Sequence, residues 1–220
     1  MNTPCTWTRA RSCEQKEQRI NEIVLATESL YKKFGYEEIT FVQIAKEAGF
    51  TRSNLYKYFK SKEEIFLEFL KYDIKLWKND LLNDFYKDGY YSIDEFSEIW
   101  ADLLKKNRRL IELISILYEH LEKHVSFESL LNFKESFSEV FQLMAEHLVN
   151  KIEGLSFEKV IEFFSLQSAL GIGLFQMTDL SDNQLKVLEK PKYSHYKIDF
   201  HEKFTKGVKY ILAGLLGTKN

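Results

Sequence analysis

The clearest chemistry in this 220-residue chain lies between Thr40 and Lys62, where cationic, phenolic and hydroxyl side chains follow one another. The guanidinium of Arg52 can donate two hydrogen bonds to O6 and N7 of guanine in the major groove of DNA. Hydroxyl, phenol and ammonium groups suit phosphate oxygens, which fix register and not sequence choice. The pattern indicates a surface that binds duplex DNA. Its candidate residues are Thr40, Thr51, Arg52, Ser53, Tyr56, Lys57, Tyr58 and Lys62.

Two short helices joined by a glycine are expected to position these side chains. Thr40-Phe41-Val42-Gln43 is a capping-box pattern, which predicts a helix over about residues 40–48. Gly49 supplies the backbone freedom that a sharp turn needs, and Thr51 starts a second helix that ends near Lys60. This is the outline of a helix-turn-helix. Exposed Arg and Lys on an ordinary helical protein are the alternative interpretation.

The same stretch closely resembles the N-terminal domain of TetR-family transcriptional regulators, over roughly residues 16–67. The resemblance is carried by Gly35-Tyr36, the Thr40 cap, Ile44-Ala45-x-x-Ala48-Gly49 and Leu55-Tyr56-x-Tyr58-Phe59-x-Ser61-Lys62-Glu63. It implies an all-helical homodimer that binds a palindromic operator in double-stranded DNA, usually to repress transcription. It also implies that a small molecule in the C-terminal domain shifts the fourth helix and releases the DNA.

The resemblance further implies roles for single residues. Thr40 and Thr51 would hold phosphates from the ends of the two short helices. The remaining positions divide into Tyr56, Tyr58 and Lys62 on the DNA backbone and Arg52, Ser53 and Lys57 nearest the bases. The chain departs from the usual family pattern at Phe50 and Ser53, so groove depth and base choice stay open. Arg9 and Arg11 suit either a minor-groove arm or a free tail.

Apolar residues recur at helical spacing along the rest of the chain, and only 2 Pro and 9 Gly occur, so the fold class is expected to be all-α. The expected nine helices span about residues 16–34, 40–48, 51–60, 61–86, 92–106, 107–124, 126–152, 156–177 and 197–215. Residues 178–196 form the long connection, with a helical turn possible near residues 185–188. The expected domains are a flexible tail over 1–15, the TetR-type helix-turn-helix domain over 16–62 and a helical ligand-binding and dimerisation domain over 63–220.

The C-terminal domain matches no motif, so its function is predicted from helix faces alone. Trp100, Phe137, Phe141 and Gln167 are candidates for an effector cavity, because apolar faces with one amide suit a lipophilic or aromatic, weakly polar small molecule. Ordinary core packing is the alternative for these aromatic residues. The last two helices are apolar all round, which predicts a homodimer interface there, with an internal core helix as the alternative.

Charge and targeting signals narrow the class of protein. The net charge is −2, but residues 1–60 carry a local excess of +3 and the remainder −5, so a basic head precedes an acidic body. The N-terminus has no signal-peptide core, and no uncharged apolar run reaches 18 residues, so a soluble cytoplasmic protein without a membrane partner is expected. Cys5 and Cys13 both lie in the tail, which argues against a disulfide scaffold.

Catalysis and metal binding find little support in the sequence. Gly171-Ile172-Gly173 lacks the third glycine of a dinucleotide fingerprint, and neither a nucleophile elbow nor a phosphate loop occurs. His120 and His124 lie one helical turn apart but are better explained as surface residues. We therefore expect no enzyme, no cofactor and no metal site. The leading hypothesis is a ligand-responsive repressor; the alternatives are a helical small-molecule binding protein whose head no longer reads DNA and, third, a helical enzyme.

Overall fold

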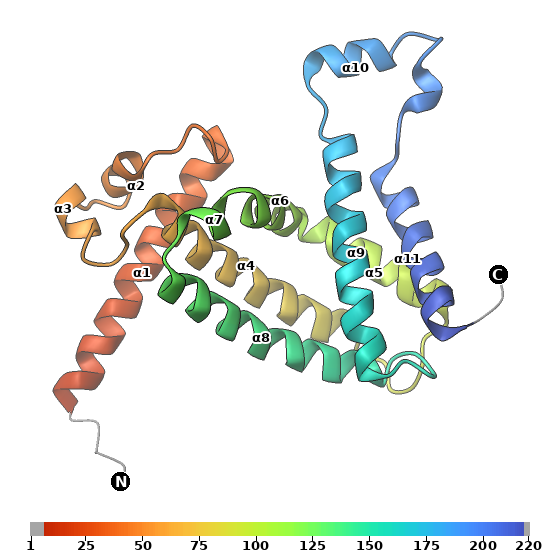
Figure 1. The fold of residues 1–220 in the computed structure, drawn as a ribbon, viewed down its shortest axis with the longest axis horizontal. Helices are drawn as coiled ribbons and strands as arrows, with labels where there is room; N and C mark the ends of the chain where they lie inside the picture. Colours follow the sequence, from red (N-terminus) through yellow and green to blue (C-terminus); the bar gives the residue numbers. More distant parts are fainter. Residues whose placement is uncertain (1–6, 218–220) are drawn as a thin grey trace. The chain divides into compact units, whose positions relative to one another are not determined.

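The computed structural model describes residues 7–217, with side chains from Glu14 onward, and this part of the chain is helical throughout, without strands (Figure 1). The all-α fold class is therefore confirmed. The chain divides into two compact units. Unit 1 comprises residues up to Tyr72 together with Ile116–Phe133, and unit 2 comprises Asp73–Ser115 together with the chain from Lys134 onward. Helices α4 (Lys62–Asp84) and α8 (Phe127–Val149) each begin in unit 1 and end in unit 2.

Unit 1 contains α1 (Trp7–Phe34), α2 (Phe41–Glu47), α3 (Arg52–Leu55), the π-helical turn η1 (Leu117–Leu121) and α7 (Glu122–His124). Helix α1 starts at Trp7 and not near Lys16 as predicted, so residues 7–15 are helical. Neither Gly nor Pro lies between Trp7 and Lys16, so nothing in the sequence stops the helix from extending towards the N-terminus. The other predicted domain boundaries stay predictions.

The turn between α2 and α3 is built as the sequence predicts. The Thr40 hydroxyl accepts from Gln43 N at 3.3 Å, and Gln43 Oε1 accepts from Thr40 N at 2.7 Å, which completes the capping box. Gly49 has φ 73°, in the left-handed region that glycine favours. Phe50 N then donates to Ala45 O at 2.8 Å and closes the turn.

Helix α3 is shorter than the helix predicted over residues 51–60. Thr51 caps it by accepting from Asn54 N at 3.2 Å, but α-helical geometry ends at Leu55. Beyond that point Lys57 N donates to Asn54 O and Tyr58 N to Leu55 O, both three residues back. Such bonds tighten the coil into turns. The buried side chains of Leu55 and Phe59 still anchor the segment at both ends.

Unit 2 contains α5 (Ile93–Lys106), α6 (Arg108–Ile116) except for its last residue, α9 (Phe157–Thr178), α10 (Asp182–Leu188), the 3₁₀ turn η2 (Ser194–Tyr196) and α11 (Phe200–Leu216). Helix α11 packs against both α5 and α9. The described residues contain eleven α-helical segments, more than the predicted nine. A π-helical turn divides the predicted helix 107–124, and a Ser181–Gln184 capping box starts α10 within the predicted connection.

Aromatic side chains fill the core of unit 2. Trp100 is 1% exposed, and its ring lies 5.0 Å from Phe163 and 5.7 Å from Phe96, measured between ring centroids. Trp100 Nε1 donates to Gln167 Oε1 at 3.2 Å, which satisfies the buried indole N–H. A further buried polar contact joins Asp73 to Arg109, with Asp73 only 4% exposed.

In the described part of the chain, α9 is the one helix whose length and composition would allow it to cross a membrane. A core or interface helix of a soluble protein has the same properties. Only 28% of its most apolar window is buried within the single chain, so much of the apolar surface of α9 is not covered by the rest of the chain.

Lowering the pH from 7 to 5 is expected to destabilise the protein partly through His147, whose Nε2 lies 3.0 Å from Phe85 O. Burial lowers the pKa of His147 more than this hydrogen bond raises it. The unfolded chain, with a histidine pKa of about 6.5, therefore takes up the proton first, and stability falls as the pH drops through about 6.5. Urea unfolding at several pH values should show a weaker pH dependence for His147→Gln than for the wild type. An unchanged dependence would contradict this assignment.

Candidate nucleic-acid interface and ligand cavity

The predicted DNA-contacting side chains lie on or beside α2 and α3 within unit 1. Six of the eight are exposed, and Tyr58 and Lys62 are partly buried. Arg52 donates to the Tyr56 hydroxyl at 3.1 Å, and its guanidinium lies 5.5 Å from the centre of the Tyr56 ring. The Tyr56 ring stacks on Phe41 at 4.6 Å between centroids. The exposed arginine is thus held on a stacked aromatic pair, and Phe41 is a supporting residue that the sequence prediction missed.

Thr51 and Ser53 lie together at the start of α3, with 3.2 Å between their hydroxyl oxygens. The Thr51 oxygen also accepts from Asn54 N as the helix cap. Both hydroxyls are exposed beside Arg52. Both hydroxyls could therefore donate to a phosphate oxygen while the Thr51 oxygen still caps α3.

Lys62 has protein partners in the free chain. Its ammonium donates to Tyr36 O at 3.1 Å and lies 3.9 Å from the centre of the Tyr36 ring. Tyr36 is 8% exposed, and burial, followed by the nearby Glu63 carboxylate, raises the pKa of its phenol. Lys62 therefore stabilises unit 1 through its contacts with Tyr36. A DNA phosphate that binds Lys62 would share the ammonium group with Tyr36.

An open hollow of about 600 Å³ lies beside the end of α3. The residues that line it are Gln15, Lys16, Gln18 and Arg19 from α1 and Lys57 and Tyr58 after α3. Arg19 also pairs with Glu22 at 2.7 Å. The sequence prediction missed Lys16 and Arg19, because only the fold brings α1 next to the end of α3. Three cationic side chains around one hollow extend the surface suited to an anionic backbone.

Unit 2 contains a separate apolar cavity of about 40 Å³, called here the inner cavity. Its walls are Ile74, Trp77, Leu104, Leu110, Ile111, Ile114, Phe137, Phe141, Phe164, Gln167, Ser168, Gly171 and Ile172. The predicted residues Phe137, Phe141 and Gln167 are among them. Trp100 is not, because it is packed in the aromatic core behind Gln167.

Gln167, which is predicted to orient a ligand, already has hydrogen-bond partners within the protein. Its Oε1 accepts from Trp100 Nε1, while its Nε2 donates to Phe164 O at 3.2 Å and Ser168 Oγ at 2.9 Å. Because the amide is held at both ends by the protein, Gln167 fixes the wall of the cavity. The sequence could not show this, since these partners depend on how α5 and α9 pack.

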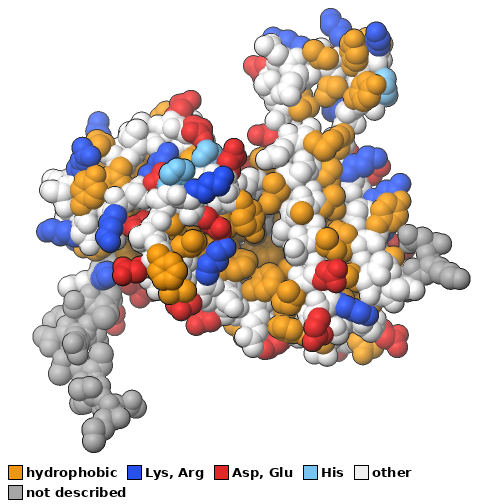
Figure 2. Space-filling view, viewed as in Figure 1, with side chains coloured by type: hydrophobic (Ala, Val, Ile, Leu, Met, Phe, Trp, Pro, Cys, Tyr) orange, Lys and Arg blue, Asp and Glu red, His pale blue; other side chains and the backbone are white. Residues whose placement is uncertain are grey.

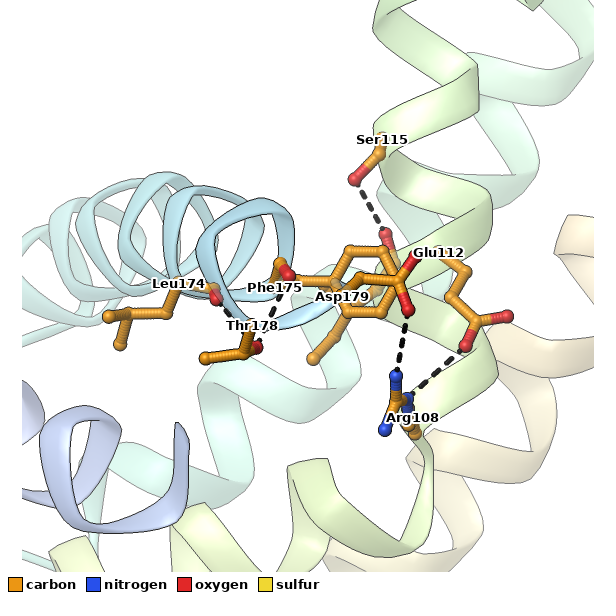
Figure 3. A network of polar contacts seen from close by, with 8 residues as sticks. Arg108, Glu112, Ser115, Leu174, Phe175, Thr178 and Asp179 are labelled. Atoms are coloured by element: carbon orange, nitrogen blue, oxygen red, sulfur yellow. Dashed lines mark hydrogen bonds and ion pairs between the residues drawn. The ribbon is translucent and has the colours of Figure 1, made fainter. Parts of the chain in front are cut away.

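A second cavity of about 230 Å³, called here the outer cavity, shares Leu104 and Ile111 with the inner one. Its walls are Leu104, Lys105, Arg108, Ile111, Phe175, Thr178, Asp199, Phe200 and His201. Figure 3 shows Arg108 of α6 between Asp179, at 3.3 Å, and Glu112, at 3.4 Å. The guanidinium also lies 5.3 Å from the Phe175 ring centre. The wall of the outer cavity therefore contains charged and polar side chains, whereas the wall of the inner cavity is mostly apolar.

The histidines considered as metal ligands have other contacts. His124 Nδ1 lies 2.7 Å from His120 O, and the His120 ring lies 5.4 Å from the Tyr36 ring. Among the residues that the structure describes, no group of three or more His, Cys, Asp or Glu side chains is arranged to hold a metal ion. Cys5 lies outside the described residues, as do the side chains of Cys13, Arg9 and Arg11.

Comparison with known proteins matches two sequence profiles to the chain. Residues 23–69 match the bacterial regulatory proteins of the tetR family, and residues 72–219 match the tetracyclin repressor-like C-terminal domain. The HTH-type transcriptional regulator YfiR of Bacillus subtilis is 40% identical over 53 residues, which are 24% of this chain and 26% of YfiR. An HTH-type regulator of Haemophilus influenzae is 23% identical over 125 residues, 56% of this chain and 61% of that protein. The alignments thus span about a quarter and three fifths of these relatives.

Solved structures share the fold. A TetR-family transcriptional regulator of Mesorhizobium loti superimposes with a TM-score of 0.57 and 14% identity, covering 90% of this chain and 97% of its own. The fatty acid degradation regulator FadR of Bacillus halodurans gives a TM-score of 0.54 at 16% identity, covering 91% and 95% of the two chains. At these identities the likeness establishes the architecture alone.

Proposed function

Because the chain belongs to the TetR family of helix-turn-helix transcriptional regulators, we propose that it is a repressor that binds a palindromic operator as a homodimer and leaves it when a small-molecule effector binds. The observation that carries this proposal is the exposed pair formed by Arg52 of α3 and Tyr56 directly after this helix, beside the Thr51 and Ser53 hydroxyls. The relatives and the similar folds are regulators rather than enzymes.

The DNA-contacting role of this surface follows from its chemistry. Arg52, Ser53 and Lys57 are proposed to lie nearest the bases, where an arginine distinguishes guanine by a bidentate contact. Phosphates are proposed to bind the side chains of Thr40, Thr51, Tyr56, Tyr58 and Lys62. The hollow lined by Lys16 and Arg19 would add long-range attraction for the backbone.

Regulators of this family typically dimerise, and we assign the interface to α9 and α11. Large apolar side chains stay exposed on these helices in the single chain, including Leu166 at 43%, Met177 at 57% and Tyr210 at 55%. Figure 2 shows hydrophobic side chains along α9 on the face in view. Large exposed apolar side chains on two helices that pack together favour a protein interface there. Dimerisation would place two recognition helices about 34–36 Å apart, one turn of DNA.

Effector control is proposed to act on α4, which belongs to both units. The effector would bind in the cavities of unit 2, where α4 contributes Ile74 and Trp77. It can release DNA only by binding the non-operator conformation more tightly than the operator-bound one. Action on DNA would place the protein in the cytoplasm.

Salt dependence of DNA binding tests the proposal. Three cations per subunit, Arg52, Lys57 and Lys62, are proposed to approach the DNA. A homodimer should then show a slope of log affinity against log salt concentration on the order of −5 with DNA from upstream of its own gene. Fluorescence anisotropy would measure the slope, and sedimentation would measure the oligomeric state. A monomer that binds effectors but no DNA would support the alternative, a helical small-molecule binding protein.

A further inference from the structure

We infer that the inner cavity binds a neutral, mostly apolar ligand with a single hydrogen-bond acceptor, and that Trp77 Nε1 donates to this acceptor. The inference deepens the effector role proposed above by naming the chemical class of the ligand. It rests on the proposed function only for the effect of the ligand on DNA. Binding itself depends on unit 2 alone.

Trp77 supplies the main observation. Its side chain forms part of the cavity wall and is only 6% exposed. Its indole Nε1 is fully buried and has no hydrogen-bond partner among the residues that the structure describes. Buried donors in folded proteins are almost always paired, because an unmade hydrogen bond is costly. A ligand acceptor would complete this site.

Trp100 provides an internal comparison in the same aromatic cluster. The rings of Trp77 and Trp100 lie 5.8 Å apart and nearly perpendicular, at 76°. Trp100 Nε1 has Gln167 Oε1 as its acceptor, whereas Trp77 Nε1 has none. The hydrogen-bonding capacity of the Trp100 indole is therefore used within the protein. We infer that the Trp77 N–H is available to an acceptor on a molecule in the cavity.

The charge of the ligand follows from the rest of the wall. No ionisable side chain lines the inner cavity, and its polar members besides Trp77 are Gln167 and Ser168. The Gln167 amide is already bonded to protein groups at both ends. An ionised ligand group would lose its hydration there without a counter-ion, which is strongly unfavourable. The part of the ligand in the inner cavity must therefore be neutral.

The shape of the ligand follows from the two cavities. The inner cavity measures about 40 Å³ and the outer about 230 Å³, and Leu104 and Ile111 belong to both walls. Together they approach the lower end of the range for small-molecule sites, about 300–1,000 Å³. A slender molecule with a narrow apolar end fits this space. The outer end would meet polar groups that already have partners, Arg108 with Asp179 and His201 with Asp102.

Butyrophenone and butylbenzene are the probes for the test, because they share a carbon skeleton and differ by a carbonyl in place of a methylene. Binding to the full-length protein would be measured by calorimetry with wild type and Trp77→Phe. The variant keeps an aromatic ring but has no N–H. We expect it to bind butyrophenone about tenfold more weakly, the loss of one net hydrogen bond, and butylbenzene within about threefold of the wild-type affinity. Equal changes for both probes would overturn the inference.

Ile74→Val is the matched control, since it alters the same wall without touching a donor. It should change the affinities for both probes by the same factor. A measurement on the wild type covers the case in which Trp77→Phe does not fold. With ¹⁵N-labelled tryptophan, the Trp77 indole proton should move downfield with butyrophenone and much less with butylbenzene. Failure of both probes to bind, or an indole signal indifferent to the ketone, would refute the assignment. Because no DNA is present in these assays, a failed DNA-binding experiment would contradict the proposed function separately.

Discussion

Replacing Arg52 and Tyr56 together with alanine is expected to abolish specific operator binding by this regulator. Each arginine contact to guanine contributes about 1–3 kcal/mol of discrimination, and a homodimer would lose two of them. Tyr56 is proposed to add a phosphate contact, and its hydroxyl accepts a hydrogen bond from the Arg52 guanidinium at 3.1 Å in the free protein. Affinity for the operator should fall by about 10²–10⁴-fold, as measured by anisotropy at fixed salt. Full retention of binding would refute the assignment of this surface.

The control for this double variant removes the same kinds of groups elsewhere in unit 1. Tyr118→Ala with Lys123→Ala deletes one exposed phenol and one exposed cation outside α2 and α3. It should leave operator affinity within about twofold, since distant surface substitutions have small effects. A comparison of single variants separates the two kinds of contact. Arg52→Ala should reduce the preference for operator over unrelated DNA, whereas Lys62→Ala should weaken both alike.

Asp73→Ala is expected to cause the largest loss of stability that a single polar substitution produces here. Asp73 is 4% exposed and accepts from Arg109 Nε at 2.7 Å and from a second guanidinium nitrogen at 2.6 Å. Removing Asp73 takes this carboxylate from the partly buried Arg109 guanidinium, whose side chain is 24% exposed, which costs up to about 3 kcal/mol. Urea unfolding would measure the loss as a lower midpoint with an unchanged slope.

Asp94→Ala provides the exposed counterpart on α5. Asp94 pairs with Lys209 at 3.1 Å, but its side chain is 81% exposed. Pairs of this kind contribute about 0–1 kcal/mol, so this variant should unfold close to the wild type. If both aspartate variants lost the same small amount, the burial of the Asp73–Arg109 pair would not matter to stability.

The caps and the turn of the helix-turn-helix segment could be predicted, because each depends on residues that are close together in the sequence. The Thr40–Gln43 capping box, the positive φ of Gly49 and the Thr51 cap each depend on near neighbours in the sequence. The length of α3 could not be predicted so well. After Leu55, backbone N–H groups donate to carbonyl groups three residues back as well as four residues back, and the α-helix ends. The apolar pattern through Phe59 does not show this change in hydrogen bonding.

The cavity region was harder to predict because its chemistry depends on tertiary packing. Gln167 has a polar side chain on an apolar helix, which predicts a contact with a ligand. In the structure its Oε1 accepts a hydrogen bond from Trp100 of another helix. For Trp77 the sequence indicates ordinary core packing, and the structure shows an N–H that is unpaired among the described residues. A tryptophan on an amphipathic helix is normally core, and only the three-dimensional arrangement shows that its N–H lacks a partner.

Helix α4 has a mechanical consequence because it runs from Lys62 to Asp84 without a glycine or proline. An uninterrupted helix curves only gently and does not fold at a joint. Trp77 of unit 2 and Lys62 of unit 1 belong to this same helix. A molecule that contacts the indole therefore contacts the same continuous helix that begins directly after the segment following α3.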